Sequence, residues 1–299
     1  MGSPWFMASP RGKIWDMTPA FRDTGSPPLD AQTDFSRARR RRVLERLAAR
    51  LRREPADFHV ILPFEEVVEA LGHRGERYLG LQTIALDSIV GSVDRTRDFD
   101  RSFRPTSRRT RKRWERMATA ARRGEAFPPI DVYRIGEVHF VKDGHHRVSI
   151  ARAQGLPDID AYVTEVFTEL GADRKITPHD LPLKSHERLF FERVPLPNEA
   201  RQQIKLGDET GFAMLAEQVE AWGFRVIQEL REPLDRREVA ERWFRDEYEP
   251  VVAMLREADL IGKRTETEAY MAISGLRYML LRTHSWDEQV IERLREELR

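Results

Sequence analysis

The chain has 299 residues, of which 40% are hydrophobic and 34% charged, and its formal net charge is only +1. No apolar run approaches the roughly 20 residues of a membrane-spanning helix, and the N-terminus lacks the basic and apolar segments of a secretion signal. Because the chain has no cysteine, disulfides and a thiolate nucleophile are excluded, and we expect a cytoplasmic protein of bacterial type that is long enough for two domains.

Residues 1–34 combine proline, glycine and serine with no helical or strand period, and we interpret them as an extended arm. Residues 35–78 are interpreted as an N-terminal helical segment. Its first helix, from 34 to 53, is strongly basic and should pack through one apolar stripe. The members of that stripe are Val43, Leu44, Leu47 and Leu51.

Two helices and one strand are predicted between this basic helix and the middle of the chain. The first helix, 64–71, is stopped by Gly72, and residues 79–90 form a β-rich run. The second helix, 106–123, buries apolar residues around Trp114 and is dense with arginine on its outer face. That outer face consists of Arg108, Arg109, Arg111, Lys112, Arg113 and Arg116.

The centre of the chain predicts a strand, a turn, a second strand and a short helix. Residues 131–135 and 138–141 flank Gly136-Glu137, and glycine at the first turn position is what a type II′ hairpin requires. The second strand leads into the motif Asp143-Gly144-His145-His146-Arg147. A helix follows this motif and should end before Gly155, a favoured residue at helix ends.

The motif combines features that bind anions. A helix N-terminus presents unpaired N–H groups and a partial positive charge. Gly144 lets the backbone approach a ligand closely, Arg147 is a forked donor suited to phosphate, and the two histidines can donate, accept or move a proton. The motif therefore predicts a phosphate pocket. In the alternative interpretation, Asp143 only caps the helix and the histidines satisfy hydrogen bonds of the core.

The run from Asp143 to Arg147, with a helix that ends in Gly155, resembles the signature of the ParB/sulfiredoxin superfamily. Partition proteins carry Gly-Glu-Arg-Arg at this place and sulfiredoxins carry Gly-Cys-His-Arg, so that His145 falls on the sulfiredoxin cysteine. The present version is most similar to ParB-like kinases that phosphorylate free serine. The resemblance implies an α+β fold, a small mixed sheet with helices, over residues 79–168.

The resemblance also implies a nucleotide site for ATP, ADP or CTP, with Mg²⁺, that hydrolyses the nucleotide or transfers a phosphoryl group to a small hydroxyl acceptor. Asp143 would give one carboxylate to the Mg²⁺. The serine kinases have a catalytic glutamate after their first strand, where this chain has only aspartates. The general base is therefore His145 or one of Asp94, Asp98 and Asp100. The candidate catalytic residues are His145, Asp143 and Asp98, and the candidate phosphate-binding residues are Gly144, His146, Arg147, Arg95, Arg104, Pro129 and Ile130.

The last part of the chain predicts no DNA-reading module. Residues 169–206 contain proline-broken segments that do not suit the helix-turn-helix which follows in partition proteins, and we interpret them as a linker. Residues 207–299 predict a C-terminal helical domain, in which Thr265 and Glu268 form a capping box and Pro250 kinks or breaks a long helix. We expect a homodimer through these helices.

Three classes of function are compatible with the sequence. They are a nucleotide-dependent enzyme, a switch in which a nucleotide closes a dimer, and a nucleic-acid- or ribosome-binding protein without catalysis. The third class would use the arginine-rich helices, and its binding should weaken steeply with salt. Its candidate residues are Arg39, Arg40, Arg41, Arg42, Arg108, Arg109, Arg111 and Lys112.

Overall fold

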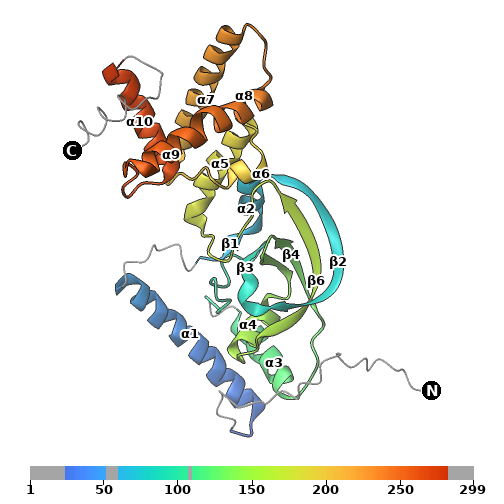
Figure 1. Cartoon of the computed structure of the whole chain (residues 1–299). Coiled ribbons are helices and arrows are strands. Elements are labelled where there is room, and N and C mark those ends of the chain that lie inside the picture. The colour runs from blue at the N-terminus through green and yellow to red at the C-terminus, as the bar shows by residue number, and fades with distance from the viewer. Residues whose placement is uncertain (1–23, 52–59, 107–109, 282–299) are drawn as a thin grey trace. The chain divides into compact units, whose positions relative to one another are not determined.

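The computed structural model of the chain describes residues 24–51, 60–106 and 110–281 (Figure 1). The chain divides into two compact units. The first, the motif unit, consists of the described residues of Met1–Ile61, Leu79–Tyr133 and His139–Val163. The second, the helical unit, consists of those of Leu62–Tyr78, Arg134–Val138 and Thr164–Arg299. The predicted phosphate-binding motif lies in the motif unit.

The described strands form one six-stranded sheet in the order β1-β3-β5-β4-β6-β2. β3 and β5 are parallel, with Ser92 opposite Val141. β4 and β5 are joined by the predicted turn, where Gly136 has a φ of 55°, as the first position of a type II′ turn requires. The predicted α+β fold with a mixed sheet is thus confirmed. The strands are β1 (Leu62–Pro63), β2 (His73–Ala85), β3 (Ile89–Ser92), β4 (Ile130–Ile135), β5 (Val138–Asp143) and β6 (Asp158–Thr168).

The short helix α4 (His145–Ala153) follows β5 directly and packs into two apolar clusters, through the buried residues Val148 and Ile150. Val148 belongs to the apolar core that the strands share with Phe99 and Phe103 of the loop after β3. Ile150 belongs to a second apolar cluster, which α4 shares with two longer helices. The first turn of α4, which carries the motif, is therefore fixed by packing.

The two longer helices are α1 (Pro27–Leu51) and α3 (Arg111–Arg122), and they lie against each other in the motif unit (Figure 1). The rings of Phe35 and Trp114 meet edge to face at a centroid distance of 5.6 Å. Trp114 also donates a buried hydrogen bond of 2.9 Å from Nε1 to Ser149 Oγ of α4. One tryptophan thus joins all three helices.

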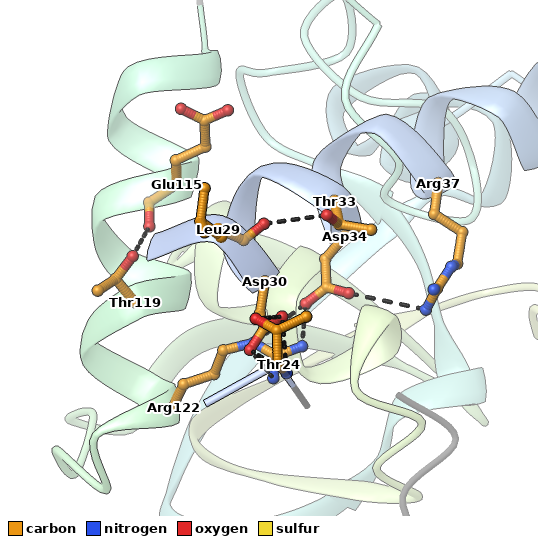
Figure 2. Close-up of polar contacts among 9 residues, drawn as sticks. All are labelled: Thr24, Leu29, Asp30, Thr33, Asp34, Arg37, Glu115, Thr119 and Arg122. Carbon is orange, nitrogen blue, oxygen red and sulfur yellow. Dashed lines mark hydrogen bonds and ion pairs between the residues drawn. The ribbon is translucent and has the colours of Figure 1, made fainter. Parts of the chain in front are cut away.

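A polar cluster fastens the N-terminal part of α1 to α3 (Figure 2). Arg122 of α3 donates to Asp34 Oδ2, and its Nη1 lies 3.9 Å from Asp30 Oδ2. Thr24 donates its hydroxyl to Asp30 Oδ1 at 2.8 Å. Both aspartates are buried, so the Arg122 guanidinium is shared by two carboxylates that have little access to water, and Arg37 Nη1 lies 3.8 Å from Asp34 Oδ1 as a second cation.

The helical unit contains the described helices of the C-terminal part, which confirms the predicted helical character of this region. Thr265 and Glu268 form the predicted capping box, with N–H to side-chain distances of 2.9 and 3.1 Å. Pro250 lies in the first turn of α9, directly after a π-helical turn, Phe244–Tyr248. Among the described residues no helix is long and apolar enough to cross a membrane. The helices are α2 (Phe64–Leu71), α5 (Leu181–Arg193), α6 (Asn198–Arg201), α7 (Glu209–Leu230), α8 (Arg236–Trp243), α9 (Glu249–Glu257) and α10 (Glu266–Leu281).

The N-terminal part differs from the prediction in two ways. The expected extended arm, residues 1–34, is helical from Pro27, because proline fits the first turn of a helix, where its missing N–H is not needed; residues 1–23 lie outside the described part. Two members of the expected apolar stripe do not pack, since Val43 and Leu44 are 64% and 65% exposed; the side chains of Leu47 and Leu51 lie outside the described part. The helix is buried instead through Ala31 and Phe35.

Two further segments were predicted wrongly from their composition. Residues 79–90 were expected to form one strand, but β2 ends at Ala85 and a 3-10 turn, Leu86–Ser88, separates it from β3. The expected linker, 169–206, contains α5 and α6, because Pro182 lies in the first turn of α5 rather than in its interior. Proline marks the beginning of this helix and does not prevent it.

Candidate phosphate-binding site

The site is built around the junction of β5 and α4. Gly144 has φ 103° and ψ 17° at the N-cap position, a left-handed conformation that side chains disfavour. A Cβ atom there would lie 2.4 Å from Cγ2 of Ile130, so contact as well as conformation requires glycine. Because the N-cap residue has no side chain, the first N–H groups of α4 have no side-chain cap and no partner within the helix.

Arg147 holds this junction to the segment that leads into β4. Its Nη1 donates to the carbonyl oxygens of Pro128 and Pro129 at 2.7 and 2.5 Å, and its Nη2 donates to Asp143 Oδ2. Its side chain is 12% exposed, whereas that of Asp143 is 68% exposed. Pro129 and Ile130, which were predicted to bind phosphate, thus contact the motif itself, through a carbonyl group and a side chain.

His145 is tied to the end of β3. Its Nε2 lies 2.7 Å from Ser92 Oγ in a buried hydrogen bond, and Ser92 Oγ also accepts the N–H of Arg95 at 3.0 Å. Asp94 Oδ1 lies 3.7 Å from the same Nε2. Burial lowers the pKa of His145 to about 4, against the opposing effect of the Asp94 charge. The imidazole is therefore neutral near neutral pH and is a weak proton acceptor.

His146 differs from His145 in its hydrogen bonds. Its ring meets the edge of Phe99 at a centroid distance of 5.4 Å, and its Nδ1 is buried with no hydrogen-bond partner among the described residues. Burial, followed by the charge of Arg113, lowers the pKa of His146 to about 4. His146 is only 7% exposed. Its neutral imidazole therefore has a buried nitrogen without a hydrogen bond, to which a ligand or a water molecule can bind.

The loop between β3 and α3 contains the remaining predicted residues. Arg95 pairs with Asp98 at 3.2 Å, and both charges act on both histidines. Arg104 is directed elsewhere, because its guanidinium donates to both carboxylate oxygens of Glu45 on α1 at 2.5 and 2.6 Å. The structure therefore brings Arg95 and Asp98 to the motif and pairs Arg104 with Glu45 instead.

Asp100, the third aspartate of this loop, has a structural role. Its Oδ1 accepts the N–H groups of Ser102 and Arg104 at 3.0 and 2.9 Å, and Arg42 Nε lies 3.6 Å from its Oδ2. Burial raises the pKa of this carboxyl group in spite of these partners. Asp94 is the more accessible carboxylate beside His145, with a side chain that is 65% exposed.

Ser92 and Arg113 were not singled out as site residues from the sequence. Ser92 ends a strand that lies parallel to β5, and that pairing joins segments about 50 residues apart, which no local pattern indicates. Arg113 lies in a run of arginines, so the sequence does not distinguish it from its basic neighbours. The signal that could have pointed to Ser92 is its position just after the predicted strand 79–90.

The residues fit a magnesium ion only in combination with a ligand. Among the described residues no group of three or more histidine, aspartate or glutamate side chains could hold a metal ion. Mg²⁺ is commonly bound by one or two carboxylates together with phosphate oxygens and water. Asp143, which is exposed at the end of β5, can supply one such carboxylate.

The arginines predicted to bind nucleic acid are divided by the structure. Arg42 donates to the carbonyl oxygen of Thr106 at 3.3 Å, and Arg111 pairs with Glu115 at 2.6 Å. Arg108 and Arg109 lie outside the described residues. The remaining members, which have no partner among the described residues, are Arg39, Arg40, Arg41 and Lys112.

Comparisons with known proteins give one finding. No family model matches the chain, and no curated protein matches it. A solved structure, the crystal structure of sulfiredoxin from Arabidopsis thaliana, is similar over 28% of this chain and 82% of its own length, with 20% sequence identity and a TM-score of 0.22. Part of the chain is thus similar to a sulfiredoxin, while the likeness to free-serine kinases stays a prediction from the motif.

Proposed function

We propose that the chain binds a phosphate-bearing ligand, a nucleotide with Mg²⁺, at the N-terminus of α4. The observation that carries this proposal is the uncapped first turn after Gly144, next to the buried Nδ1 of His146 that has no partner among the described residues. A helix N-terminus favours anions through its free N–H groups and its dipole, and the imidazole adds a further polar atom.

The charges around the motif favour a nucleotide that arrives with its cation. Three arginines, Arg95, Arg113 and Arg147, are opposed by three aspartates, and Arg95 and Arg147 are already paired with two of these. A bare polyphosphate that binds these arginines would leave the carboxylates of their partners without a cation, whereas Mg²⁺ bound to the phosphate offsets the carboxylate charges. The aspartates are Asp94, Asp98 and Asp143.

Phosphoryl transfer or hydrolysis at this site would need a proton acceptor. His145 has a pKa of about 4 and an occupied Nε2, so it suits an orienting role more than that of general base. Asp94, with its exposed carboxylate beside His145, is the better candidate to accept the proton of an attacking hydroxyl group or water. Asp94→Asn should then abolish turnover while leaving nucleotide affinity within a few-fold of the parent.

Calorimetric titration and thermal shift with ATP, ADP and CTP, each with and without Mg²⁺, test the binding proposal. A ligand at 100 times its Kd adds about 2.7 kcal/mol of stability when it binds only the folded chain. His146→Phe keeps a flat ring against Phe99 but removes both nitrogens, and should weaken binding about tenfold.

Arg104→Gln is the matched control for this experiment, because the Arg104 guanidinium is already paired with Glu45 of α1. Its nucleotide affinity should equal that of the parent chain. If no nucleotide raises the melting temperature of the parent, with or without Mg²⁺, the proposed function is wrong.

A second candidate, binding of nucleic acid, is favoured by the charge pairing on α1 and α3. The two helices together carry eleven arginines and one lysine against four acidic residues. Each of these acidic side chains already pairs with an arginine of the motif unit. The cations left without a partner among the described residues are Arg39, Arg40, Arg41, Lys112, Arg113 and Arg116.

The test is retention of single- and double-stranded RNA and DNA at several salt concentrations. Replacing Arg39, Arg40 and Arg41 by glutamine should weaken binding and lower the salt slope by about two to three units. The control replaces three exposed cations of the helical unit, Arg236, Lys263 and Arg264, and should leave retention unchanged. Equal loss in both triple variants would indicate a general charge effect and contradict a surface on α1.

A further inference from the structure

We infer that Asp143 occupies the place of an anion on Arg147 and thereby selects ligands with two or more negative charges; this rests on the proposed function. Arg147 has two kinds of contact. The two bonds to the carbonyl oxygens of Pro128 and Pro129 fix its position in the fold. The third contact, from Nη2 to the Asp143 carboxylate, joins Arg147 to a side chain that is mostly exposed.

The exposure of the two partners shows which of them can leave. The Asp143 side chain is 68% exposed and the Arg147 side chain 12%. A carboxylate in this position can rotate into water with little change in solvation, and an exposed ion pair contributes little to stability. The guanidinium would remain beside the first turn of α4, because its two carbonyl contacts do not depend on Asp143.

A second ion pair beside the motif has the same arrangement. Arg95 and Asp98 are three residues apart, 3.2 Å from each other, and both are partly exposed. In each pair a carboxylate within four residues of the arginine fills the position that a ligand oxygen would take. The free site therefore already contains anions, supplied by its own chain.

This arrangement penalises ligands with a single charge. A monoanion that displaces Asp143 replaces one negative charge on Arg147 by another and gains little electrostatic energy. A phosphate dianion or a polyphosphate brings more charge to the same guanidinium and to the N–H groups of α4. Asp143 then acts as a specificity-determining residue for highly charged ligands.

The alternative role of Asp143, a ligand of Mg²⁺, predicts effects of the opposite sign. If Asp143 competes with the anion, its removal strengthens binding when Mg²⁺ is absent. If it holds the cation, its removal weakens binding when Mg²⁺ is present and has no effect otherwise. One carboxylate cannot serve Arg147 and Mg²⁺ fully at the same time, so the two roles can be separated by experiment.

The test is calorimetric titration of the full chain with pyrophosphate, and with ADP, in the presence of EDTA and in the presence of Mg²⁺. Asp143→Asn should bind pyrophosphate about tenfold more tightly than the parent in EDTA, and it should gain measurable affinity for the monoanion acetate. The control is Asp158→Asn, which removes one exposed carboxylate of the same unit and should bind as the parent does.

Each outcome has a separate meaning. Equal affinity of the parent and Asp143→Asn for pyrophosphate in EDTA overturns the inference and leaves the proposed function standing. Weaker binding of Asp143→Asn, seen only with Mg²⁺, overturns it in favour of the cation-holding role. If neither protein binds any of the ligands, the inference and the proposed function both fail. Binding of ADP by the parent with Mg²⁺, together with tighter binding of pyrophosphate by Asp143→Asn than by the parent in EDTA, supports both.

Discussion

At the scale of single residues, the two adjacent histidines of the motif differ in their surroundings. His145 bonds with Ser92 at the end of β3, while the buried Nδ1 of His146 has no partner among the described residues. The motif predicted both side chains, but it could not assign their roles. The difference depends on which strand lies beside β5, and that pairing is set by the packing of the whole sheet.

The burial of these histidines predicts how stability changes with pH. In the folded chain both have a pKa of about 4, below the 6.5 of exposed histidine. Between these values the unfolded chain binds protons that the folded chain does not, so the free energy of unfolding falls as pH decreases from about 6.5 to about 4. From about pH 7 to about pH 5, we expect a loss on the order of 1–2 kcal/mol for each histidine.

Urea denaturation at both pH values tests this expectation. His145→Gln retains an amide that can bond with Ser92 but has no group that titrates in this range. It should lose less stability than the parent between the two pH values. The same loss in both proteins would show that other groups, not His145, are responsible for the pH dependence.

At the scale of elements, the sequence was sufficient to predict the ends of helices where glycine determines the backbone conformation. Gly72 ends α2 and Gly144 begins α4, as predicted, and the structure gives both a positive φ. Proline was harder to interpret, because the same residue can interrupt a helix or begin one. Pro27 and Pro182 both lie at the beginning of a helix. Whether a helix forms after the proline depends on the apolar residues against which the following turns pack. Those partners are distant in sequence, so composition alone suggested an arm and a linker.

The contact between α1 and α3 depends on Arg122, which neutralises Asp30 and Asp34 (Figure 2). Arg122→Leu would take the closest cation away from two buried carboxylates and leave Asp34 only the longer contact with Arg37, at 3.8 Å. Breaking such a buried pair costs about 3 kcal/mol or more. Arg111→Gln breaks the more exposed pair with Glu115 and the contact of the guanidinium with the Phe35 ring at 5.7 Å, and should cost only on the order of 1 kcal/mol. Hydrogen exchange of the α1 amides measures both, with much faster exchange expected only in Arg122→Leu.

A result in which both variants accelerate exchange equally would contradict the central position of Arg122. Adding Asp30→Asn and Asp34→Asn to Arg122→Leu should restore slow exchange in part. These changes remove the carboxylate charges that the first substitution leaves uncompensated.

At the scale of the whole molecule, the net charge of +1 conceals an uneven distribution. The arginine surplus is concentrated on α1 and α3 in the motif unit. The sequence predicted the mixed sheet through the resemblance of its motif, and the helical C-terminal region through repeated local patterns. It could not predict which arginines are paired, since the acidic partners lie on other elements: Arg104 meets Glu45 across 59 residues.

The hydrogen bond from Trp114 to Ser149 has a consequence for how ligand binding would be sensed. Separating α3 from α4 would strand a buried indole N–H, at a cost of about 1–3 kcal/mol, so small rearrangements of the two helices are mechanically coupled. The proposed capture of a nucleotide at the start of α4 would then be transmitted to the basic helices through Trp114, whose fluorescence reports that movement once the emission of the other five tryptophans is separated from it.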